Sequence, residues 1–197
     1  MMKSKAVVLD KGGTLIEDIP YNVDSDLIRL SDGALEALRM FQEMGYQLIV
    51  VTNQSGIARG FFPESALGKL EDRLREILAS ANIVLNGFYY CPHHPQGKVS
   101  EYAFECSCRK PQPGMILRAA LDHELDLSAS WMIGDILNDM EAGNLAGCRT
   151  ILLKNGHETE WNITTSRRPD FVVKNLQEAA QVVNNELLFK RILSDAQ

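Results

Sequence analysis

Six short apolar runs alternate with stretches of helical periodicity, and this alternation limits the possible folds more than any other feature of the chain. The runs, which we interpret as strands, cover 5–10, 46–56, 86–91, 130–135, 148–154 and 170–175. The expected helices cover 33–45, 63–81 (with Pro63 near its first turn), 114–125, 138–147 and 176–193. Parallel strands need long crossover connections, usually helices. The sequence therefore predicts an α/β fold, a three-layer, doubly wound and mostly parallel sheet of Rossmann-like type.

Composition narrows the class of protein. A chain of 197 residues fits a single domain over 1–197. A net charge of −6 without a basic tract argues against a nucleic-acid partner. No apolar run approaches the roughly 20 residues of a membrane span, and the N-terminus lacks the apolar stretch of a signal peptide. We therefore expect a cytoplasmic monomer with no membrane partner, whose four cysteines are metal ligands or packing residues rather than disulfides.

Polar residues stand where several of the expected strands end. They are Asp10, Thr52, Asn53, Cys91 and Asp135. Ligands of open α/β sheets bind beyond the carboxyl ends of the strands, so these side chains are candidates for one shared site. Asp10, which precedes a Gly-Gly turn, is either a nucleophile toward phosphorus or the cap of that turn.

A second carboxylate, Asp139, follows Asp135 after one helical turn. Two or three carboxylates that converge at strand ends suit Mg²⁺, which binds one or two carboxylates together with phosphate oxygens of the substrate. Asp139 has a second explanation as an acid favoured by the helix dipole, and both explanations can hold. Lys110, in the segment CRKPQPG at 108–114, is either a phosphoryl-neutralising cation or a solvated lysine.

The cysteines cluster with histidines in the segments CPHHP (91–95) and CSC (106–108). Three cysteines and one histidine make a closed tetrahedral zinc site, whose role is structural. We expect the ligands Cys91, His93, Cys106 and Cys108, with His94 as the alternative histidine. Free buried thiols are the competing explanation.

Four segments together resemble the haloacid dehalogenase (HAD) superfamily of aspartyl-phosphate enzymes. They are LDKGGTLIEDIPYN (9–22), VVTNQSGIARG (50–60), the cysteine segment ending in CSCRKPQPGM (106–115) and WMIGDILNDMEAGNLAGC (131–148). The zinc loop and the NQSGIARG run are similar to the D-glycero-D-manno-heptose 1,7-bisphosphate phosphatase subfamily, close kin of histidinol-phosphate phosphatases. The resemblance implies a HAD-like domain without a large cap, covered by a zinc-bound loop at about 91–108.

The resemblance also implies a reaction and its residues. A Mg²⁺-dependent phosphatase would remove one phosphate from heptose 1,7-bisphosphate, leaving the 1-phosphate or the 7-phosphate, through an aspartyl-phosphate intermediate. Asp10 would be the nucleophile and a Mg²⁺ ligand, together with Asp135 and the backbone of Gly12, while Thr52 and Lys110 would steady the phosphoryl group. The substrate pocket would comprise Asp18, Ile19, Pro20, Tyr21, Asn53, Gln54, Ser55, Arg109 and Ile136. Such an enzyme would belong to the carbohydrate metabolism that leads to lipopolysaccharide.

Position 12 departs from the family pattern, which has an aspartate there as general acid and base, whereas this chain has Gly12. Losing such a group costs typically 10²–10⁴-fold in rate, so we expect turnover at least ~10²-fold below that of a Gly12→Asp form.

Two further interpretations of the function stay open: a pseudo-phosphatase that binds a phosphorylated ligand, and a histidinol-phosphate phosphatase. An enzyme that needs no acid at position 12, as in dehalogenases and phosphonate-cleaving relatives, is disfavoured by the zinc loop and NQSGIARG.

Overall fold

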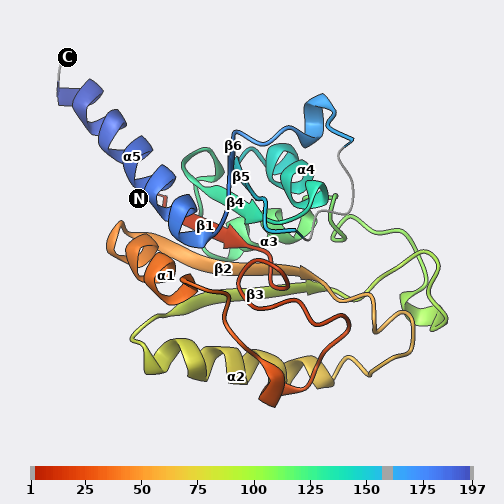
Figure 1. Ribbon diagram of the computed structural model, residues 1–197. Helices are drawn as coiled ribbons and strands as arrows, with labels where there is room; N and C mark the ends of the chain where they lie inside the picture. The colour runs from red at the N-terminus through yellow and green to blue at the C-terminus, as the bar shows by residue number, and fades with distance from the viewer. Residues whose placement is uncertain (1–2, 157–161, 196–197) are drawn as a thin grey trace.

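The computed structural model describes residues 3–156 and 162–195, and its centre is one parallel sheet (Figure 1). Its strands lie in the order β3-β2-β1-β4-β5-β6. Their bounds are β1 Lys5–Leu9, β2 Tyr46–Asn53, β3 Leu85–Cys91, β4 Trp131–Gly134, β5 Arg149–Leu153 and β6 Phe171–Val173. The helices are α1 Ala34–Glu43, α2 Ala66–Ser80, α3 Gly114–Asp122, α4 Leu137–Ala146 and α5 Leu176–Asp195. Every strand pairing is parallel within the described residues.

The helices cover both faces of the sheet, as the alternating pattern predicts. Val7 and Leu9 of β1 pack in a core with the apolar faces of α1, α2 and α5. Ala6 and Val8 point to the opposite face and pack with α3 and α4. Figure 1 shows α1 and α2 on one side of the strands and α4 on the other. The three-layer, doubly wound α/β prediction is confirmed.

The structure corrects some element boundaries. Helix α2 begins at Ala66, so Pro63 lies before the helix, where its carbonyl accepts a hydrogen bond from the Ala66 N–H at 3.0 Å. That bond spans three residues, so a tight turn precedes the α-helical bonding. Strand β6 is shorter than its apolar run, at three residues, and the loop between β3 and α3 contains a 3₁₀ turn at Ser100–Tyr102.

The strand order reverses direction between β1 and β4, and this switch point positions the site. Leu9 of β1 pairs with Ile133 of β4, and the Asp10 N–H donates to the Ile133 carbonyl at 3.0 Å. Asp10 and Asp135 therefore leave the sheet at the same edge, on neighbouring strands. Open α/β sheets bind ligands at this kind of switch point, beyond the carboxyl ends of the strands. Along the described residues, no helix combines the length and the apolar character that crossing a membrane requires.

Candidate active site

Three carboxylates meet beyond the switch point. One oxygen each of Asp10, Asp135 and Asp139 lies within 4.8 Å of the others. Their exposed fractions are 9%, 4% and 0%. Asp10 follows β1, Asp135 follows β4 and Asp139 lies in the first turn of α4, so three different positions in the chain supply one cluster.

Burial and mutual repulsion make this cluster unfavourable as three free anions. Burial, followed by the charges of Asp10 and Asp139, raises the pKa of Asp135 to about 8. Burial also raises the pKa of Asp139 to about 6, against the lowering influence of Lys110. Oxygen ligands that share a crowded negative site suit a hard divalent cation, which would favour their ionised forms. The donor set therefore fits Mg²⁺.

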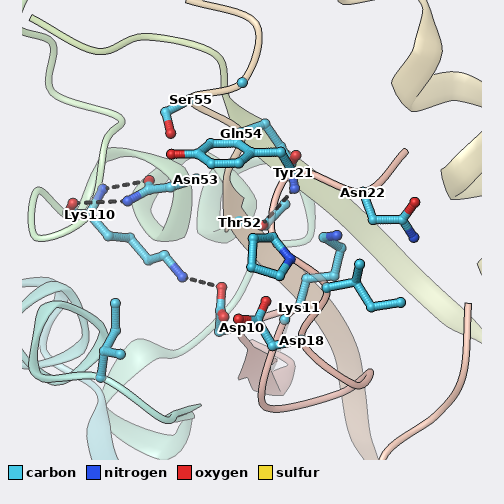
Figure 2. A pocket seen from close by; sticks show the side chains of 15 residues that line it. Asp10, Lys11, Asp18, Tyr21, Asn22, Thr52, Asn53, Gln54, Ser55 and Lys110 are labelled. Atoms are coloured by element: carbon cyan, nitrogen blue, oxygen red, sulfur yellow. Dashed lines mark hydrogen bonds and ion pairs between the residues drawn. The ribbon is translucent and has the colours of Figure 1, made fainter. Parts of the chain in front are cut away.

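Lys110 is the buried cation that balances part of this charge. Its Nζ lies 2.5 Å from Asp10 Oδ1 (Figure 2). It also lies 2.7 Å from Asp139 Oδ1 and donates to the Val51 carbonyl at 3.1 Å. Burial alone would lower the pKa of Lys110, but the carboxylates of Asp10 and Asp139 raise it above its ordinary value. The ammonium is therefore buried between two carboxylates and points at the proposed nucleophile, unlike the solvated lysine considered above.

Asp139 acts as a helix cap and as the partner of Lys110. Its Oδ2 accepts from the Ile136 N–H at 3.2 Å at the start of α4, which agrees with the helix-terminus explanation. Gly134 makes room for it, since a Cβ at Gly134 would lie 2.2 Å from Asp139 Oδ2. The Lys110 pairing had no signal in the sequence, because the two residues lie in separate segments.

A cavity of about 290 Å³ opens in front of Asp10 and Lys110. The expected site residues that line it are Asp10, Gly12, Asp18, Ile19, Pro20, Tyr21, Thr52, Asn53, Gln54, Ser55, Lys110 and Ile136. The structure adds Lys11, Asn22 and Gly56. Arg109 is not among the lining residues; its guanidinium instead donates to the His93 carbonyl at 3.3 Å.

Lys11 is the one charged residue among the three that sequence reasoning missed. Its side chain is buried at the cavity, and this burial lowers its pKa, while Asp10 and Asp18 counteract the shift. A lysine directly after a strand-ending aspartate was the available signal. Its positive charge makes this end of the cavity more favourable for an anionic substrate.

Residues at the end of β2 and just after it form the opposite wall and support Lys110. The Asn53 side chain exchanges two hydrogen bonds with the Lys110 backbone, and Gln54 Nε2 donates to Thr52 Oγ1 at 3.1 Å. Tyr21 packs edge-on against Phe61 at the rim, with ring centroids 4.7 Å apart. Asn53 therefore lines the cavity while its amide is already committed to holding Lys110.

Gly12 lies in the turn after Asp10, and its φ is not in the left-handed region, unlike that of Gly13 at 76°. An L-residue is therefore conformationally acceptable at position 12. A Cβ built there would lie 2.8 Å from Asp18 Oδ1, the far end of an exposed side chain. The space beside Gly12 is thus occupied by another carboxylate.

The cysteine cluster assembles from the last residue of β3 and from the loop between β3 and α3. Donor atoms of Cys91, His93, Cys106 and Cys108 lie within 4.8 Å of one another. The three Sγ–Sγ distances are 3.1, 3.2 and 3.5 Å, and His93 Nδ1 lies 3.4 Å from Cys108 Sγ. Ligands of tetrahedral zinc with ~2.3 Å Zn–S bonds stand about 3.8 Å apart, so these donors fit after spreading by a few tenths of an ångström.

His94, the alternative ligand, is engaged elsewhere: its Nδ1 accepts from the Gln96 N–H and its Nε2 lies 3.1 Å from Arg59. The loop that carries the cluster rests on the segment after β2. The N–H groups of Lys98 and Val99 both donate to the Ala58 carbonyl, at 2.7 and 2.9 Å. The loop then leads from Cys108 directly to Lys110, so its geometry and that of the active site are linked.

Comparison with known proteins agrees with this geometry. Residues 107–179 match the family described as HAD-hydrolase-like. The D-glycero-beta-D-manno-heptose-1,7-bisphosphate 7-phosphatase of Salmonella typhi is 38% identical over 92% of this chain and 96% of its own length. The enzyme of the same name from Escherichia coli K12 is 40% identical over 92% and 94%. The D,D-heptose 1,7-bisphosphate phosphatase of B. bronchiseptica, solved with magnesium and phosphate, superposes with a TM-score of 0.78 at 29% identity, over 92% and 99% of the two chains.

Proposed function

The chain belongs to the D-glycero-beta-D-manno-heptose-1,7-bisphosphate 7-phosphatase family of HAD-like phosphatases, and from this premise we propose that it releases the 7-phosphate of heptose 1,7-bisphosphate. The observation that carries the proposal is the meeting of Asp10, Asp135 and Lys110 at the switch point of the sheet, where Asp10 and Lys110 line the cavity. Positive groups and a nucleophilic carboxylate in one crevice are the requirements of phosphoryl transfer.

We assign the first step to Asp10. A carboxylate oxygen of Asp10 attacks phosphorus, the bond between phosphorus and the sugar oxygen breaks, and an aspartyl-phosphate forms. Lys110 stays protonated and neutralises charge on the phosphoryl oxygens, and Thr52 donates a hydrogen bond to one of them. Attack of water on the phosphorus then releases phosphate and restores Asp10.

The Mg²⁺ ion would be held by Asp10, Asp135 and the Gly12 backbone carbonyl. When bound, it would supply charge neutralisation between the carboxylates and the phosphate. Asp139 has both oxygens engaged, with Lys110 and with the Ile136 N–H, and therefore serves as a positioning residue. The Asp135 carboxylate accepts from Thr14 Oγ1 at 3.3 Å, which helps to orient it.

We propose that zinc, held by Cys91, His93, Cys106 and Cys108, gives the loop at 91–108 a fixed shape. Four protein ligands leave no open position, so the ion would be structural. Reduced thiolates are required, which agrees with a cytoplasmic location. We propose that the protein acts as a monomer of one domain.

The test is phosphate release from heptose 1,7-bisphosphate in the presence of Mg²⁺, with ³¹P NMR to show which phosphate is lost. The Asp10→Asn form is the control, since it keeps the shape of the nucleophile without its charge. We expect release by this chain and none by the control. Faster release from histidinol phosphate would favour that substrate, and binding of the bisphosphate without any release would favour the pseudo-phosphatase.

A further inference from the structure

If the protein hydrolyses a sugar phosphate, as proposed above, its active site needs a group that donates and accepts protons. The departing sugar oxygen is a basic alkoxide that must be protonated, and the attacking water must lose a proton. Position 12, two residues after the nucleophile, has no side chain to do this. Another residue of the cavity has to be considered.

Among the residues that line the cavity, only Asp10 and Asp18 carry carboxylates. Asp10 is the nucleophile and is bound to Lys110. Lys110 is held between two carboxylates and keeps its proton. Asp18 is the remaining carboxylate of the lining, and Figure 2 shows it facing the same part of the cavity as the carboxylate of Asp10.

Asp18 occupies the place that a side chain at position 12 would take. Its Oδ1 lies 2.8 Å from the Cβ that Gly12 lacks. In an aspartate, the carboxylate oxygens stand roughly 2.4 Å from the residue's own Cβ, by standard bond lengths. The Asp18 oxygen therefore lies at nearly the same distance from this Cβ position as the carboxylate oxygens of an aspartate at position 12 would.

Local structure holds Asp18 there. Residue Ile16, two positions earlier, makes β-bridges with Gly12 and with Leu30. The Glu17 N–H donates to the Arg29 carbonyl at 2.9 Å. The segment is thus fixed on both sides just before Asp18, while the carboxylate itself reaches solvent.

We propose that Asp18 is the general acid and base of this enzyme, in place of a residue at position 12. As Asp10 bonds to phosphorus, the Asp18 carboxyl gives its proton to the sugar oxygen whose bond to phosphorus breaks. The Asp18 carboxylate then takes a proton from the water that attacks the aspartyl-phosphate, which releases phosphate and restores both carboxyl groups. The sequence-based expectation of impaired turnover assumed that no residue takes this role.

The test is a double-mutant cycle of the full chain: unchanged, Asp18→Asn, Gly12→Asp, and both together, with Glu17→Gln as the matched exposed control. We expect Asp18→Asn to lower kcat about 10²-fold in the unchanged chain, and Gly12→Asp to restore it in the double variant. Restoration shows that the loss was not misfolding. Glu17→Gln should leave kcat unchanged.

A second readout separates proton transfer from binding. The leaving group of p-nitrophenyl phosphate needs no proton. With this substrate, Asp18→Asn should leave formation of the aspartyl-phosphate unchanged and slow its hydrolysis. The aspartyl-phosphate should therefore accumulate during turnover, and rapid acid quenching should trap it. An unchanged kcat in Asp18→Asn, or a rise of ~10²-fold in Gly12→Asp alone, would overturn the role of Asp18. Inactivity of all four forms toward every phosphate ester would instead overturn the proposed function, and this inference with it.

Discussion

The side-chain amide of Asn53 holds the backbone of Lys110 with two hydrogen bonds. Asn53 Nδ2 donates to the Lys110 carbonyl at 3.1 Å, and the Lys110 N–H donates to Asn53 Oδ1 at 3.0 Å. This pairing fixes the point from which the Lys110 side chain starts toward Asp10. Although Lys110 lies in a loop, its backbone is therefore held in place by the end of β2.

We predict that Asn53→Ala lowers kcat by more than about 10-fold, because small displacements of catalytic groups are costly. Unpairing two backbone groups should also reduce the free energy of unfolding by about 1–3 kcal/mol. Steady-state kinetics and urea unfolding measure the two effects. Gln112→Ala removes an exposed amide near Lys110 and is the control, which should match the unchanged chain. Equal kinetics of the two variants would mean that Lys110 is positioned by other contacts.

Removing Asp139 should destabilise the protein strongly. The Asp139→Ala variant leaves a buried ammonium with one carboxylate fewer and also removes the cap of α4. Breaking a buried ion pair typically costs about 3–5 kcal/mol. Chemical unfolding should show such a loss for Asp139→Ala, and little change for Asp122→Ala, whose pairing with Arg118 is on the surface. Similar losses in both variants would contradict the importance of the buried pair.

Asp135 should determine magnesium affinity. Asp135→Asn removes one anionic ligand and keeps the size of the side chain, so Mg²⁺ binding should weaken at least about 10-fold, the low end for loss of supporting groups around a metal. Isothermal calorimetry measures this directly, without turnover. Glu105→Gln, which changes an exposed carboxylate outside the cluster, should leave the affinity unaltered. An unaltered affinity in Asp135→Asn would place the ion elsewhere.

Zinc removal should affect catalysis through Lys110. Protein purified without added metal should contain about one zinc per chain, by the four-ligand rule. Cys108→Ser should lose the zinc and lower kcat, since Cys108 stands two residues before Lys110. Cys148→Ser, outside the cluster, should retain the metal. Full activity of a zinc-free Cys108→Ser form would show that the loop and Lys110 are independent.

The fold was predictable because the buried faces of strands and helices appear in the sequence as apolar residues at regular spacing. Each strand expected from an apolar run exists, and the residues that differ lie at element ends, such as Ala66 in place of Pro63 at the start of α2. The site was partly predictable for the same reason. Asp10 and Asp135 follow strands that had to be parallel, so they had to meet at one edge.

Loop geometry was not predictable in this way. Arg109 was expected to line the substrate cavity, but its guanidinium donates to the His93 carbonyl instead. Lys11 lines the cavity although the sequence did not predict it. Loops lack a repeating contact pattern, so their side-chain directions depend on partners distant in sequence.

By itself, the sequence determined the layers of this protein, the edge at which its carboxylates gather and the cysteine and histidine residues that cluster at the end of β3 and after it. These follow from hydrophobic periodicity and from side-chain chemistry, which are local properties. Only the tertiary structure decided that Asp139 and Asp10 share Lys110, that Asn53 holds the Lys110 backbone, and that Asp18 fills the space beside Gly12. Those pairings join separate segments through packing of the whole domain, and no local pattern records them.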